Sequence, residues 1–117
     1  MAKILATLLG IALLAIGLVG VVSGGDDHRL LIFGINAGHN TVHLVSGAVA
    51  LAMAMISERA AMLFCLAFGS IYGVVAVAGF FQLPIAVRTL NLNMPDNFLH
   101  LGIAVVCLWV GGLSKGE

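Results

Sequence analysis

Four uninterrupted apolar stretches dominate the chain, and polar residues lie almost entirely between them. None of the stretches alternates apolar with polar positions, as a half-buried β-strand does, so each is predicted to be a helix. A helix needs about 20 apolar residues to cross a bilayer. The second and fourth stretches reach this length if their helices begin several residues earlier, within the polar segment before each. The stretches cover residues 4–22, 41–56, 60–81 and 98–113.

Charged residues are excluded from all four stretches, and this segregation identifies the stretches as membrane spans. A charge in hydrocarbon costs at least about 2.5 kcal/mol. The composition agrees, because 62% of the residues are hydrophobic and 9% are charged, whereas about 25% are charged in typical soluble domains. We therefore predict an all-α polytopic membrane protein, with four transmembrane helices bundled in a single transmembrane domain over residues 1–117. The charged residues are Lys3, Asp26, Asp27, Arg29, Glu58, Arg59, Arg88, Asp96, Lys115 and Glu117.

The first stretch has some features of a signal peptide. Lys3 precedes it, and Val21, Val22 and Ser23 form a tolerable cleavage context. Its length of about 19 residues exceeds the usual hydrophobic region of a signal peptide, which has about 7–15. We therefore expect a retained span.

The connections between the stretches predict the topology. The turn at residues 57–59 is tight, so the second and third helices should form an antiparallel hairpin. With four spans, this turn and both termini share one side of the membrane. That side carries Lys3, Arg59 and Lys115, and the other carries Arg29 and Arg88. The positive-inside rule therefore predicts cytoplasmic termini.

The second half of the chain repeats the first with a shift of 57 residues. The overlay matches Asn36, Asn40, His43 and Leu44 with Asn93, Asn97, His100 and Leu101. The predicted repeats cover about residues 1–57 and 58–117, and each consists of a helix, a long loop and a helix. Parallel repeats of this kind are related by an axis along the membrane normal. We therefore expect the two polar motifs to lie at one depth, on the extracytoplasmic side.

These polar motifs resemble a known protein family. The patterns HN-x-x-HL and DN-x-LHL are similar to those of small bacterial four-helix membrane proteins catalogued as domain of unknown function 4383. The resemblance runs from the first span to about Leu113, and the sequence departs from the pattern at Ala104, where the family usually has Gly. It implies a multi-pass protein of the bacterial cytoplasmic membrane with no assigned activity. The residues that carry it are His39, Asn40, His43, Leu44, Gly47, Asp96, Asn97, Leu99, His100 and Leu101.

The same motifs are candidates for a metal or cofactor site. Residues four apart share a helix face, so His39 pairs with His43, and Asp96 pairs with His100. If the two pairs face each other, they provide a tetrahedral nitrogen and oxygen site compatible with zinc, copper or iron. A b-type haem with His43 and His100 as axial ligands is a second form, and a chlorophyll-type pigment on one histidine is a third. In the metal hypothesis, the side chains of Asn40 and Asn97 orient the imidazoles.

A structural interpretation competes with the metal hypothesis. Asn36 and Asn93 are good N-caps, and Asp96 completes a capping box. His43 and His100 would then hydrogen-bond to Asn97 and Asn40 across a polar seam between the helices. This interpretation, which the sequence favours, predicts a small structural or accessory membrane subunit.

Further hypotheses follow from what the chain contains and lacks. A proton or solute path would have few polar residues to line it beyond Ser46, Ser70 and Tyr72. The chain has no recognisable catalytic motif, so an enzyme is not expected. It has no basic stripe, so nucleic acid is not expected as a partner. The expected partners are the lipid bilayer and a homo-oligomer or larger membrane complex.

Overall fold

Four long helices form the body of the protein, and each is long and apolar enough to cross a membrane. The computed structural model describes residues 1–114. The predicted four-helix bundle is confirmed, and two short β-strands and a fifth, short helix join it. The elements are α1 (Ala2–Ser23), β1 (His28–Leu30), β2 (Phe33–Ile35), α2 (Ala37–Ile56), α3 (Glu58–Phe80), α4 (Pro84–Leu90) and α5 (Met94–Leu113).

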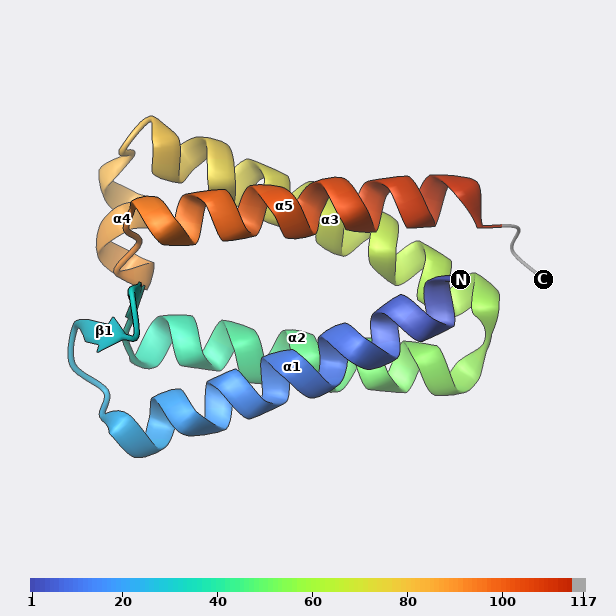
Figure 1. The fold of residues 1–117 in the computed structure, drawn as a ribbon, viewed down its shortest axis with the longest axis horizontal. Helices are drawn as coiled ribbons and strands as arrows, with labels where there is room; N and C mark the ends of the chain where they lie inside the picture. The colour runs from blue at the N-terminus through green and yellow to red at the C-terminus, as the bar shows by residue number, and fades with distance from the viewer. Residues whose placement is uncertain (115–117) are drawn as a thin grey trace.

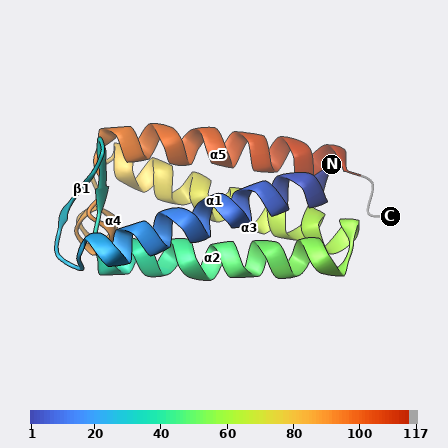
Figure 2. The same cartoon turned by 60° about the horizontal axis from the view of Figure 1, so that its bottom comes forward.

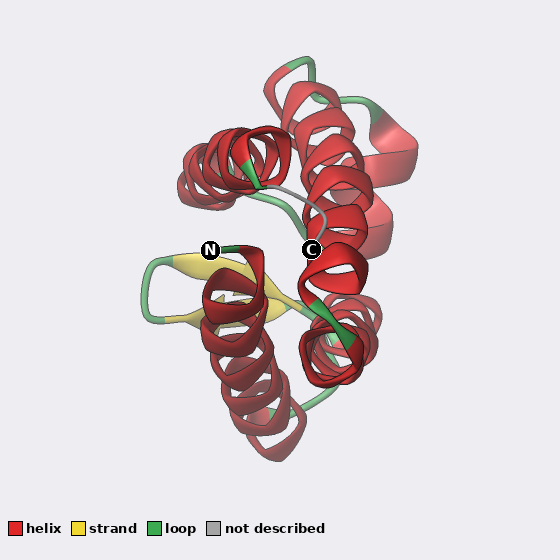
Figure 3. Ribbon diagram, turned by 90° about the vertical axis from the view of Figure 1, so that its right-hand side faces the viewer, coloured by secondary structure: helices red, strands yellow, loops and turns green. Residues whose placement is uncertain are grey.

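The long helices are arranged as two antiparallel pairs (Figure 1). Helix α1 packs mainly on α2, and α3 packs mainly on α5. The N-terminus, the α2–α3 turn and the end of α5 lie at one end of the bundle, and the strands and α4 cover the other end (Figures 1 and 2). Figure 3 looks along the bundle from the end with the termini, with the β-hairpin at the far end. We call the hairpin and α4 together the cap.

The dimensions of the bundle match those of a bilayer. The long helices have 20 to 23 residues, which at 1.5 Å per residue gives about 30–35 Å, the thickness of the hydrocarbon core. The longest extent of the molecule is 42 Å, close to the roughly 40–45 Å of a bilayer with its headgroups. The protein is therefore a multi-pass membrane protein.

Helix α1 has its small residues inside and its large residues outside. Its buried face consists mostly of alanine and glycine, while Ile4, Leu8 and Val22 are exposed. Lipid tails are as apolar as leucine, so burying large apolar side chains between helices gains little, and small residues let helices approach closely. The pattern is therefore typical of a helix that faces lipid on one side and packs against helices on the other.

Helices α2 and α5 begin inside the polar segments, as predicted, because asparagine caps them. The Asn36 side chain accepts a hydrogen bond from the His39 N–H at 2.9 Å. The Asn93 side chain accepts one from the Asp96 N–H at 3.1 Å, and Asp96 accepts one from the Asn93 N–H at 2.9 Å. Both predicted N-caps and the capping box are thus confirmed. The caps bring the polar motifs into the first turns of the two helices.

The sequence predicts long loops between α1 and α2 and between α3 and α5, and these two segments contain the cap. Strands β1 and β2 pair antiparallel through a turn at which Leu31 has a left-handed backbone, with φ 58°. Helix α4 begins at Pro84, and Asn91 ends it in the left-handed region, which asparagine tolerates better than most residues. These elements are too short to produce a sequence periodicity. Side-chain hydrogen bonds described below hold them together.

Candidate metal centre

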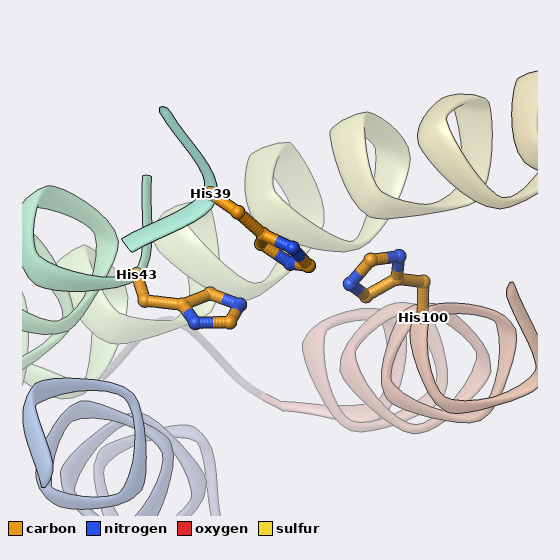
Figure 4. Close-up of side chains that lie close together, drawn as sticks. All are labelled: His39, His43 and His100. Carbon is orange, nitrogen blue, oxygen red and sulfur yellow. The ribbon is translucent and has the colours of Figure 1, made fainter. Parts of the chain in front are cut away.

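Three histidines converge beneath the cap. His39 and His43 come from α2 and His100 comes from α5, and Figure 4 shows their rings pointing toward one another. One ring nitrogen from each histidine lies within 4.8 Å of the other two. The ring of His39 is the central one, with its centroid 4.4 Å from that of His43 and 5.5 Å from that of His100. We call these three residues the histidine cluster.

The cluster is buried but has few hydrogen bonds. His39, His43 and His100 are 2%, 8% and 4% exposed. By strict geometry, both ring nitrogens of His39 and the Nδ1 atoms of His43 and His100 are buried without a hydrogen-bond partner, although the His39 ring lies near the backbone of Gly34 and of Leu90. Leaving a buried polar group unsatisfied costs about 1–3 kcal/mol, and native proteins contain few such groups. The three imidazoles are therefore not satisfied core residues.

Two of the rings present the same nitrogen to the cluster. In His43 and His100 the nitrogen farther from the backbone, Nε2, points toward the other rings, and Nδ1 points away (Figure 4). The buried unpartnered nitrogens of these two residues are their Nδ1 atoms. The inward side of the cluster is thus formed by nitrogen lone pairs or N–H groups from two different helix pairs.

Asp96 lies outside the cluster, although the sequence grouped it with the histidines. Its Oδ2 atom accepts hydrogen bonds from the backbone N–H groups of Gly34, at 3.0 Å, and Asn93, at 2.9 Å. The carboxylate thus joins the β-hairpin to the first turn of α5. It is 2% exposed. The structure therefore brings together three of the four metal-ligand candidates and gives Asp96 a capping role.

Asn40 and Asn97 are buried beside the cluster, at 1% and 3% exposed. Both side-chain polar atoms of Asn40, and Oδ1 of Asn97, lack a hydrogen-bond partner. The bonds that the seam hypothesis expects, from His43 to Asn97 and from His100 to Asn40, are not formed among the described residues. The polar seam therefore lacks the hydrogen bonds that would make it stabilising.

Asparagine side chains tie the cap to both helix pairs. Asn36 donates to the Thr89 carbonyl at 3.1 Å, Asn91 donates to the Ile35 carbonyl at 2.9 Å, and Asn93 donates to the Ile32 carbonyl at 2.9 Å. These bonds join residues more than 50 positions apart. Asn91 is not among the residues predicted from the sequence, although an asparagine just after a short helical segment is a common sign of a left-handed C-cap.

Tyr72 of α3 is a further neighbour of the cluster. Its ring lies edge-on to that of His100, with 5.1 Å between centroids. It is 4% exposed, and its hydroxyl has no hydrogen-bond partner. Ser46 of α2 lies near this hydroxyl.

Comparison with known proteins identifies one family. The model of the family described as Domain of unknown function (DUF4383) matches residues 3–113, which is nearly the whole chain. Neither a curated protein nor a solved structure matches the sequence.

Proposed function

We propose that this chain, which belongs to the DUF4383 family, binds a transition-metal ion within the membrane through the histidine cluster. The observation that carries the proposal is the convergence of three buried imidazoles, four of whose six ring nitrogens are buried without a hydrogen-bond partner. The ligands come from α2 and α5, so the ion would join the two helix pairs.

The ligand chemistry suits borderline first-row ions. Imidazole nitrogen is a ligand for zinc, copper and iron, whereas calcium and magnesium prefer oxygen. Three protein ligands leave one position of a tetrahedral ion open, as in catalytic zinc sites. Such an ion supplies Lewis acidity or, for copper and iron, electron transfer. Asp96, one turn before His100, would offset part of the positive charge.

The structural and haem alternatives have less support. The seam hypothesis relies on His–Asn hydrogen bonds that are not formed among the described residues. A haem held by His43 and His100 would place its macrocycle between those rings. The His39 ring lies there, 4.4 Å from the ring of His43.

The proposed setting is the bacterial cytoplasmic membrane, with cytoplasmic termini and the cluster toward the opposite face. Lys3 and Arg59 belong to the end with the termini, and Arg29 and Arg88 belong to the cap end. With Lys115, which lies outside the described residues, the positive-inside rule favours this orientation. The proposed repeats, about residues 1–57 and 58–117, agree with the similar packing of the two helix pairs.

Metal loading of the purified protein tests the proposal. The protein in detergent is stripped with a chelator, incubated separately with Zn(II) and with Cu(I) under anaerobic conditions, desalted, and analysed for bound metal. We expect one ion per chain to be retained. His43→Ala and His100→Ala should abolish retention, because each removes a ligand. Wild-type protein that retains neither ion would refute the proposal.

His28→Ala is the matched control. His28 lies in the cap and is not part of the cluster. Its Nδ1 atom is hydrogen-bonded to the Asp26 carbonyl at 2.6 Å, and its Nε2 atom is hydrogen-bonded to the Ser23 hydroxyl at 2.9 Å. This variant should retain metal. His100→Gln, which keeps a side chain of similar length and polarity, provides a second cluster variant if the alanine variant does not fold.

A further inference from the structure

The Nδ1 atoms of His43 and His100, which point away from the cluster, would need hydrogen-bond partners once a metal is bound. A histidine that coordinates an ion through Nε2 carries its proton on Nδ1, and that N–H group needs an acceptor. The Nδ1 atoms of His43 and His100 are buried and have no partner. Each loaded ring would therefore need an acceptor from the protein beside it.

Two acceptors lie in the same part of the bundle. Asn40 precedes His43 by three residues, and Asn97 precedes His100 by three, so each pair lies side by side on its helix surface. The Oδ1 atoms of both asparagines are buried and unpartnered. Each helix pair thus holds an unpaired donor position and an unpaired acceptor within one helical turn.

Glycines on the neighbouring helices accommodate both asparagines. A Cβ atom on Gly20 of α1 would overlap Asn40 Oδ1 and lie 2.6 Å from its Cγ, and one on Gly79 of α3 would overlap Asn97 Oδ1 and lie 2.7 Å from its Cγ. Real Cβ atoms essentially never approach so closely. Gly20 and Gly79 therefore provide the space in which the two amides are seated.

We propose that Asn40 and Asn97, seated against Gly20 and Gly79, are positioning residues of the metal centre. Their amide oxygens accept the Nδ1 hydrogens of His43 and His100, so both rings bind the ion through Nε2. The inference rests on the proposed metal site and specifies its ligand atoms. The two helix pairs contribute the same set: a glycine on the first helix, and an asparagine and a histidine on the second.

Alanine variants of the two glycines test this inference. In Gly20→Ala and Gly79→Ala the new methyl group displaces the amide, and we expect the affinity for Zn(II) to fall about 10- to 100-fold, as is typical when an outer partner of a ligand is lost. Gly73→Ala is the matched control on α3, because its Cβ would lie 3.7 Å from the nearest atom, which is ordinary contact. Gly102→Ala, with open space around it, is the control on α5.

A double-mutant cycle separates positioning from general packing. If Gly20 acts through Asn40, then Gly20→Ala should lower Zn(II) affinity in the wild-type background and have no further effect in Asn40→Ala. Equal losses in both backgrounds would show that the glycine acts by another route, and would overturn the inference.

The ligand atom itself can be observed. ¹⁵N NMR of histidine-labelled protein loaded with Zn(II) should place the proton on Nδ1 and the metal on Nε2 in His43 and His100. Metal on Nδ1 in either ring would overturn the inference while leaving the proposed metal site intact. Wild-type protein that binds no metal would instead refute the proposed function.

Discussion

At the scale of single residues, Gly34 in β2 is a tightly constrained position outside the cluster. Its N–H donates to Asp96, and a Cβ atom there would overlap the backbone oxygen of Asn91 and lie 3.2 Å from Asp96 Oδ2. Three segments of the chain thus meet at one backbone position, so a glycine is required for packing rather than for its backbone freedom.

Gly34→Ala should therefore destabilise the protein. The clash involves a backbone atom, which cannot rotate away, and overpacking of this kind costs about 1–3 kcal/mol. Thermal unfolding in detergent, followed by circular dichroism, measures the change. Gly25→Ala is the matched control, because its Cβ would make an ordinary 3.6 Å contact with Ala37. Equal thermal midpoints for the two variants would contradict the role of Gly34.

At the scale of elements, the polar residues at the start of α5 have two functions. Asn93 caps the helix through its side-chain oxygen and ties down the hairpin through its Nδ2 atom, 2.9 Å from the Ile32 carbonyl. Asp96 likewise serves both the capping box and the hairpin. The same side chains therefore define where the helix begins and attach the cap to it.

Replacing Asn93 separates the two functions. Asn93→Ala should lower the free energy of unfolding by about 1 kcal/mol for the lost cap, and somewhat more because the bond to the hairpin is also lost. Asn93→Ser keeps a capping oxygen but not the amide donor, so it should recover most of the loss. The measurement is denaturation in mixed detergent micelles. A serine variant as unstable as the alanine variant would indicate that the bond to the hairpin dominates.

The starts of the helices were predictable, while the contents of the cluster were predictable only in part. Asn36 and Asn93 identify the starts of α2 and α5 because capping is a local property of a few residues. The spacing of His39 and His43 also predicts a shared face. Spacing could not show that the Asp96 carboxylate accepts a hydrogen bond from the Gly34 N–H instead of joining the histidines. Which of the two it contacts depends on where the β-hairpin lies. The unpredicted elements, β1, β2 and α4, depend on contacts between distant segments.

At the scale of the whole molecule, the histidine cluster lies between two helix pairs that touch each other much less than the helices within each pair do. The cap joins the pairs at one end through asparagine side chains, and the α2–α3 turn joins them at the other. A bound ion would add a direct connection between α2 and α5 one turn below the cap.

Metal should therefore stabilise the folded bundle. An ion that binds only the native state adds about 2.7 kcal/mol when its free concentration is 100 times the dissociation constant. We expect Zn(II) to raise the thermal midpoint of the wild type in detergent and to leave that of His100→Ala unchanged. A rise of equal size in both proteins would mean that the ion binds elsewhere.

The division of ligands between α2 and α5 has a consequence for biosynthesis. The α1–α2 pair can form once residue 56 has been made, and at that point the chain offers only His39 and His43. The third ligand and the carbonyl of Thr89, to which Asn36 donates, are synthesised more than 30 residues later. A nascent or truncated chain therefore has an incomplete cluster, and the proposed metal binding would require the fully inserted protein.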